Sequence, residues 1–230
     1  MPKRGRKYRE AAALIDREKN YSREEAVKLL KATATTKFDP TVEVHARLGV
    51  DPRHADQQVR EVVVLPHGLG KKVRVLVFAE GEDAHLATEA GADIIADDEI
   101  IKKIQGGWVD FDIAIATPRM MGKAGRLGRV LGPRGLMPNP KAGTVVPGPD
   151  LPRVIQESKA GRVEFRVDKT ANIHAPFGKA SFSEQQLREN LDAILDALDR
   201  ARPDSIKGIY IRRLTIANAM GPGIRLDSQG

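Results

Sequence analysis

The alternation of apolar and polar residues near both ends of the chain constrains the fold most. Apolar side chains occupy every second position of residues 42–50, and Glu43 and His45 stand between them. A period of two is typical of a β-strand with one buried face and one wet face. The pattern returns at residues 163–168 and again at 209–216. Both ends of the chain therefore predict half-exposed antiparallel sheet.

Helices are predicted around these strands. Residues 9–16 and 22–34 have helical patterns, and Ser22 with Glu25 three positions later forms a capping-box motif. A third helix starts at Ser183, carries leucines on one stripe and stops before Pro203. We expect residues 59–65 to form a strand that partners residues 42–50. The two ends together predict a sheet with helices on one side.

The middle of the chain has a different pattern. Three short apolar runs, at residues 73–79, 92–96 and 112–116, are separated by helical segments at 82–90 and 98–105. Strands that are apolar throughout and alternate with helices indicate a parallel sheet covered on both faces.

The fold class is therefore α/β in two domains. Residues 1–67 and 160–230 are predicted to form a discontinuous α+β domain, into which residues 68–159 insert a Rossmann-like three-layer α/β domain. Gly68, Gly70 and Gly161 lie at the joins. Two chain crossings at glycines predict a hinge.

Positive charge is concentrated in one stretch. The 230 residues carry a net charge of +7, and no Asp or Glu lies between Ile113 and Pro149. We call this stretch the basic segment; its cations are Arg119, Lys123, Arg126, Arg129, Arg134 and Lys141. Its glycines and prolines predict a loop of unpaired cations. Unopposed cations repel one another unless a polyanion supplies counter-charge, which makes nucleic acid the leading partner.

Composition narrows the other possibilities. The chain has no cysteine, and its five histidines show no metal-binding spacing, so we expect no metal site. No apolar run approaches the roughly 18 residues of a membrane span, and the apolar run after the basic first residues is too short for a signal peptide, so we expect a cytoplasmic location.

Aromatic residues make up 4% of the chain, which excludes a long stacking platform for single strands and favours folded RNA.

Catalytic motifs are weak. Leu65–Lys71 fails as a phosphate-binding loop, and the glycines of the basic segment lack dinucleotide-binding spacing. His174 with Asp168 and Ser181 could form a triad, but His174 fits a structural or RNA hydrogen bond better. A nucleotide-dependent enzyme in the inserted domain remains the main alternative function, and a free-standing nucleic-acid regulator is a third.

Two apolar residues stand at the ends of the half-exposed sheet. Phe38 follows Lys37 just before the first strand, and Met220 precedes Gly221 after the last one. Each could fill the core. Alternatively, each could contact RNA, since a glycine beside methionine lets a backbone come close to a ligand.

Five motifs carry a resemblance to a known family. They are residues 37–45 (KFDPTVEVH), 65–71 (LPHGLGK), 131–145 (LGPRGLMPNPKAGTV), 159–166 (KAGRVEFR) and 220–222 (MGP). Together they resemble the bacterial large-subunit ribosomal protein L-one family, the stalk proteins, from Pro2 to about Asp227.

This resemblance implies a non-catalytic, monomeric ribosomal protein without a cofactor. Its partners would be the stalk of large-subunit (23S) rRNA, deacylated tRNA at the exit site and its own operon mRNA, whose translation it would repress. The implied rRNA- and mRNA-binding residues are Lys37, Phe38, Thr41, Arg166, Lys169, His174, Lys179, Thr215, Met220 and Gly221. The implied tRNA-facing residues are Lys123, Arg126, Arg129, Arg134 and Lys141. Asn218-Ala219 departs from the hydroxyl residues that the family commonly has before Met-Gly.

Overall fold

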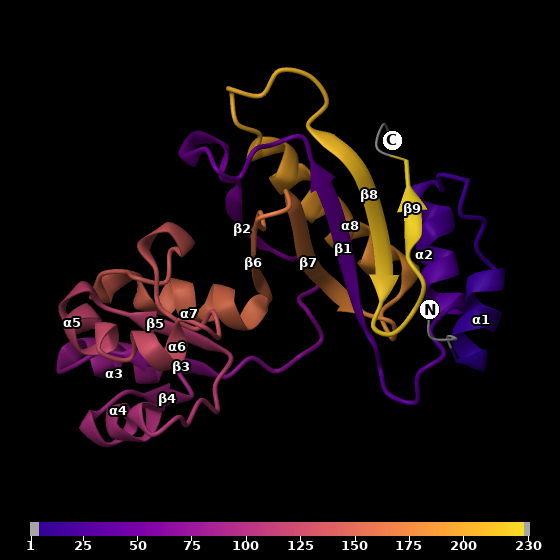
Figure 1. Ribbon diagram of the computed structural model, residues 1–230. Coiled ribbons are helices and arrows are strands. Elements are labelled where there is room, and N and C mark those ends of the chain that lie inside the picture. The colour runs from indigo at the N-terminus through magenta and orange to yellow at the C-terminus, as the bar shows by residue number, and fades with distance from the viewer. Residues whose placement is uncertain (1–4, 228–230) are drawn as a thin grey trace. The chain divides into compact units, whose positions relative to one another are not determined.

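A computed structural model describes residues 5–227 (Figure 1), so the outermost residues of the predicted outer domain, 1–4 and 228–230, lie outside the described part. The fold is mixed α/β. The chain divides into two compact units: unit 1 comprises the chain up to Gly70 and from Val163 onward, and unit 2 is Lys71–Arg162. The chain changes unit three residues after each predicted boundary.

Unit 1 is built on a four-stranded antiparallel sheet. Its strand order is β7 (Asn172–Lys179), β1 (Thr41–Leu48), β8 (Ile211–Asn218) and β9 (Ile224–Leu226). Burial along β1 alternates strictly at its first six residues, which confirms the predicted half-exposed strand.

One predicted pairing is wrong. The strand expected at residues 59–65 is β2 (Arg60–Val64), and it pairs with β6 (Arg162–Arg166) in a separate two-stranded sheet instead of with β1. The place beside β1 is taken by β7, which was not predicted. Pro176 and Gly178 weaken its strand pattern, and the β1–β7 register shifts opposite them, between Val42 and Glu43.

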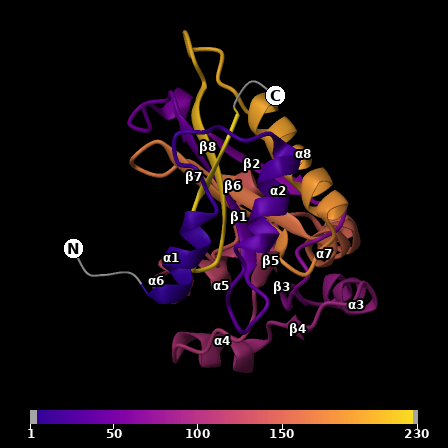
Figure 2. The same cartoon turned by 90° about the vertical axis from the view of Figure 1, so that its right-hand side faces the viewer.

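Helices cover one face of the four-stranded sheet. Unit 1 contains α1 (Arg6–Ala13), α2 (Arg23–Ala32), the short 3₁₀ helix η1 (Ala55–Gln57) and α8 (Glu184–Arg200). Capping boxes begin α2, at Ser22, and α8, at Ser183. Each serine hydroxyl accepts a hydrogen bond from the backbone N–H three residues later, and the side chain of that later residue accepts one from the serine N–H. Figure 2 shows α2 and α8 on the same side of the sheet, where they bury the apolar residues of β1, β7 and β8. The other face is left open.

Unit 2 contains the predicted parallel sheet, in the order β4 (Ile94–Ile95), β3 (Val75–Phe78) and β5 (Ile113–Ala116). Val75 and Val77 pack with α3 (Glu82–Glu89) and α7 (Leu151–Ala160). Leu76 and Phe78 point the other way and pack with α4 (Asp98–Gln105). Successive side chains of a strand point to opposite faces, so a strand buried on both is apolar throughout.

The basic segment is not the loop that its glycines predicted. It contains η2 (Pro118–Met120), α5 (Met121–Gly125), α6 (Gly128–Leu131) and η3 (Pro140–Ala142), and η4 (Gly148–Asp150) leads into α7. Ala124, Leu127 and Leu131 are buried in the core of unit 2. Apolar anchoring therefore holds these short helices in place.

The three candidate hinge glycines all have left-handed backbones, with φ of 63° at Gly68, 66° at Gly70 and 109° at Gly161. Gly161 ends α7 as its C-cap. A Cβ at Gly70 would lie 2.7 Å from the ring of Phe182. Conformation and close packing thus each require glycine, and the hinge role stays a prediction.

Candidate nucleic-acid interface

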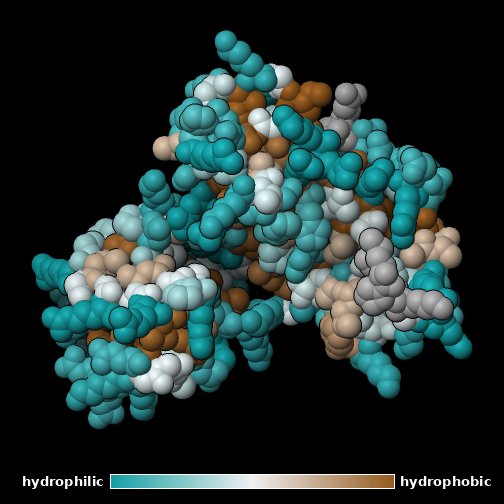
Figure 3. All heavy atoms as spheres, in the orientation of Figure 1, coloured by the Kyte–Doolittle hydropathy of each residue, from teal (hydrophilic) through white to brown (hydrophobic). Residues whose placement is uncertain are grey.

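The open face of the four-stranded sheet carries polar side chains. The pairing registers place His174 of β7 opposite His45 of β1, His45 opposite Thr215 of β8, and Thr215 opposite Arg225 of β9. Figure 3, which views this unit from the same side as Figure 1, shows mostly hydrophilic residues over β1 and β8. The structure thus brings the predicted His174 and Thr215 into one row. His45 and Arg225 were not predicted as site residues, although the period of two already put His45 on the wet face.

The two histidines interact directly. Nδ1 of His45 lies 2.8 Å from Nδ1 of His174, so a single proton can bridge them. Glu43 lies 4.0 Å from His45, and Asp168 lies 3.8 Å from His174. Burial and the neighbouring His174 lower the pKa of His45, and Glu43 opposes this shift. The lowered pKa favours the neutral form of His45 at the surface of the sheet.

Asp168 organises the turn that leads into β7. Burial acts to raise the pKa of Asp168, but hydrogen bonds from the backbone of Asn172 and from Thr170 outweigh it and lower the pKa to about 2. The ionised carboxylate thus fixes this turn. Lys169 within the turn and Arg166 at the end of β6 both point to solvent, as an RNA contact requires.

Lys179 and Thr41 mark the other end of the β1–β7 pair. They are direct cross-strand partners, and the Lys179 amine donates a hydrogen bond of 2.8 Å to the Thr41 hydroxyl. Both side chains are partly exposed. Two more of the predicted residues therefore form one local pair.

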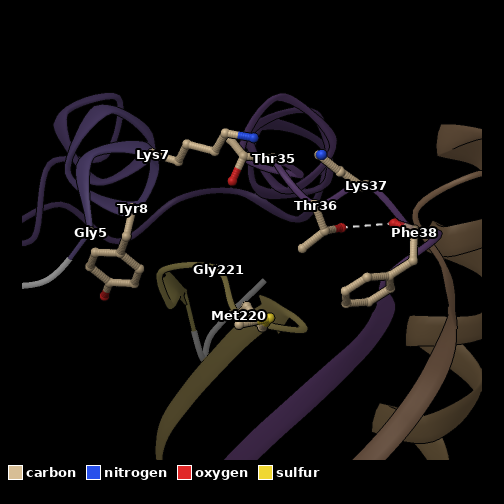
Figure 4. Close-up of a pocket in the computed structure, with 9 residues that line it drawn as sticks. All are labelled: Gly5, Lys7, Tyr8, Thr35, Thr36, Lys37, Phe38, Met220 and Gly221. Atoms are coloured by element: carbon tan, nitrogen blue, oxygen red, sulfur yellow. Dashed lines mark hydrogen bonds between the residues drawn. The ribbon is translucent and has the colours of Figure 1, made fainter.

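A depression of about 760 Å³ lies beside this sheet (Figure 4). Its lining residues are Gly5, Lys7, Tyr8, Thr35, Thr36, Lys37, Phe38, Met220 and Gly221. The Phe38 side chain is 56% exposed and Met220 is 79% exposed. These exposures rule out the core alternative for both residues. The structure instead gathers four predicted residues, Lys37, Phe38, Met220 and Gly221, around one apolar opening.

The turn that presents Met220 is tightly fixed. Met220 has a left-handed φ of 65°, and the N–H of Gly221 donates to the carbonyl of Asn218. A Cβ at Gly221 would lie only 1.6 Å from the Asn218 side-chain oxygen. The buried Asn218 amide donates to the carbonyl of Leu30 at 2.9 Å, and the N–H of Ala219 donates to the carbonyl of Thr41 at 2.8 Å. The departure from the family pattern thus includes an asparagine that anchors the turn to α2.

The predicted cations of unit 2 do not all lack partners. Lys123 pairs with Glu80 and Asp98, and the hydrogen bonds to these carboxylates raise the pKa of the lysine. Its prediction as an unpaired cation is therefore wrong, because the acids that neutralise it lie outside the basic segment. The remaining predicted cations are exposed and have no carboxylate partner within residues 5–227; they are Arg126, Arg129, Arg134 and Lys141.

The imagined catalytic triad does not form. Ser181 donates its hydroxyl to Asp39 at 2.7 Å, and His174 faces His45. Within the part of the chain that the structure describes, no three His, Cys, Asp or Glu side chains group into a metal site. No helix among residues 5–227 is long and apolar enough to cross a membrane.

One comparison with known protein families matches most of the chain. The model of the Ribosomal protein L1p/L10e family matches residues 30–222, which include part of each of the two chain segments of unit 1 and all of unit 2. The chain therefore belongs to this family of ribosomal proteins, whose members are structural and not enzymatic.

Proposed function

We propose that the chain binds the stalk of large-subunit rRNA through unit 1. The observation that carries this proposal is the pair of exposed apolar side chains, Phe38 and Met220, beside an open polar sheet face. An exposed aromatic ring and a nearby thioether can stack on or pack against bases. The hydroxyl, imidazole and ammonium groups of Thr41, His174 and Lys179 can bind the phosphates and ribose hydroxyls of folded RNA.

Arg166, Lys169 and Thr215 complete the proposed rRNA surface. The same surface would bind the operon mRNA if that message folds into a similar shape, because folded RNA is recognised largely by its shape and backbone. Translational repression follows as competition between the two RNAs for one site.

Unit 2 is proposed to act on deacylated tRNA at the exit site. Arg126, Arg129, Arg134 and Lys141 offer exposed positive charge on short helices anchored in the core of the unit. Such charge supplies long-range, salt-dependent attraction to a phosphate backbone and little sequence specificity. Gly68, Gly70 and Gly161 would let the two units, as separately folding domains, change their mutual orientation.

Joining residues 1–70 to 163–230 through a short glycine linker tests the division of roles. Unit 1 has a hydrophobic core of its own, so the joined fragment should fold by itself. It should then bind a transcribed bacterial rRNA stalk almost as tightly as the whole chain does. Filter binding measures both affinities. A loss of more than about tenfold, roughly 1.4 kcal/mol, would assign primary RNA affinity to unit 2 and contradict the proposal.

A further inference from the structure

A second, smaller depression of unit 1 is lined by arginines. It has a volume of about 290 Å³ and lies between the α1 region and the β8–β9 hairpin. Its lining includes Arg17, Arg213 and Arg225 together with the hydroxyl residue Thr215 and a single acid, Asp16. We call it the arginine notch. Its charge alone favours an anionic occupant.

The backbone pairing places two of these arginines, Arg213 and Arg225, on the same open face of the sheet. Arg213 and Thr215 are two positions apart on β8 and so share the open face, and Arg225 stands directly opposite Thr215 on β9. Arg213 also stands directly opposite Arg47 of β1. Like charges in directly opposed positions destabilise an antiparallel pair. A bound anion would offset the repulsion between these opposed arginines, which explains why the sheet tolerates it.

Among the described residues, the single carboxylate that lines the notch, that of Asp16, forms no ion pair with its arginines. Across residues 5–227, none of Arg17, Arg47, Arg213 and Arg225 forms an ion pair. Asp16 accepts a hydrogen bond from the backbone N–H of Glu18 on one of its carboxylate oxygens. The guanidinium groups are therefore free to bind an external oxyanion, for which their planar fork is suited.

The notch also has room and an approach. Position 223 on its edge is glycine, and a Cβ there would already lie 3.0 Å from the methyl group of Thr215. Tyr8 lines both the notch and the depression that holds Phe38 and Met220. The two depressions thus border one residue, and a nucleotide chain that packs on Met220 can continue past Tyr8 into the notch.

We propose that the arginine notch binds a phosphodiester group of the same RNA that unit 1 binds. The proposal rests on the proposed RNA-binding function and adds an electrostatic subsite on β8, β9 and the segment after α1. Its ligand is the RNA backbone, because the notch offers positive charge and hydroxyl groups, and Tyr8 is the only aromatic residue in its lining.

The test is a triple variant, Arg17→Gln, Arg213→Gln and Arg225→Gln, in the full chain. Filter binding to a transcribed bacterial rRNA stalk should weaken about tenfold near 150 mM salt. The plot of log affinity against log salt should flatten by about 0.9 for each RNA phosphate that the variant no longer neutralises. The matched control, Arg53→Gln, Arg200→Gln and Lys207→Gln, removes the same charge from exposed positions outside the notch and should leave the slope unchanged.

Ethylation of single RNA phosphates locates the contact. The wild-type chain should show interference at a phosphate where the triple variant shows none. An equal loss in both triple variants, or an unchanged ethylation pattern, would overturn the proposal. The proposal would also be overturned if inorganic phosphate binds the wild-type chain while the triple variant shows the same ethylation interference as the wild type, because the notch would then bind free anions and not the RNA. If the wild-type chain fails to bind the stalk, the proposed function itself fails; if only Phe38 and Met220 variants lose affinity, the notch alone is refuted.

Discussion

Truncation of Phe38 and Met220 to alanine distinguishes an RNA-binding role from a structural role. The two roles predict different changes in folding free energy and in RNA affinity. Full burial of a side chain of this size stabilises a protein by about 1.5–3 kcal/mol. Phe38 is 56% exposed and Met220 is 79% exposed, so less than half of that is available at Phe38 and about a fifth at Met220. Phe38→Ala should therefore cost roughly 1 kcal/mol of folding free energy, and Met220→Ala roughly 0.5 kcal/mol.

The expected effect on RNA binding is larger. Loss of base stacking or close packing costs roughly 1–3 kcal/mol, which corresponds to about a 5- to 150-fold rise in Kd for the rRNA stalk. Denaturant unfolding and filter binding on the same preparations measure the two quantities. Ile209, which is 76% exposed at the other end of β8, supplies a matched control, since Ile209→Ala should change neither.

Phe177, fully buried in the same unit, calibrates the opposite case. Phe177→Ala should cost roughly 3–5 kcal/mol of stability. If Phe38→Ala resembles Phe177→Ala in stability and leaves Kd unchanged, the exposed ring has no RNA role and the central observation of the proposal is refuted.

Three further predictions concern charge, pH and the Met220 turn. Gln substitutions at Arg126, Arg129 and Arg134 should leave stalk-RNA affinity nearly intact but change the rate of tRNA release from reconstituted ribosomes; an unchanged rate would contradict the tRNA role. The pKa of His45 is lowered from 6.5, so the unfolded chain binds more protons below that pH. Acidification from neutral pH to below 6.5 should therefore reduce the melting temperature less in His45→Gln than in the wild type. Parallel plots of melting temperature against pH would refute a lowered pKa at His45. Asn218→Ala removes a buried hydrogen bond to the carbonyl of Leu30, which keeps its bond from the Thr33 hydroxyl, and should cost about 0.5–1.5 kcal/mol in denaturant unfolding; a neutral effect would show that the turn does not need this anchor.

The sequence predicted the sheet where its signal is local. Strand β1 and the parallel strands of unit 2 follow directly from apolar periodicity, because each face of a strand is either buried or wet along its length. Strand pairing is not local. β7 was missed because Pro176 and Gly178 interrupt its pattern, and without β7 the strand at residues 60–64 was wrongly paired with β1.

The basic segment shows a second limit of local patterns. Its charges and glycines predicted a loop, yet Ala124, Leu127 and Leu131 are spaced by three and four residues, the spacing of one helical face. That weak signal was present. The partners of Lys123 could not be found in this way, because Glu80 and Asp98 are 43 and 25 residues away in the chain.

The alternation in β1 links the fold of unit 1 to its proposed function. Helices α2 and α8 bury one face of the sheet. Because side chains alternate along a strand, every second residue must then lie on the other face, even where this brings like charges together. This constraint sets histidine against histidine and Arg47 against Arg213. The arginine pairing weakens the free protein because two guanidinium groups repel, and the histidine pairing lowers the pKa of His45, so both pairings disfavour positive charge on this face. A bound RNA phosphate, as proposed for this face, would favour both pairings, because its negative charge would stabilise an imidazolium and screen the arginines. A surface selected for stability alone would place opposite charges in these registers.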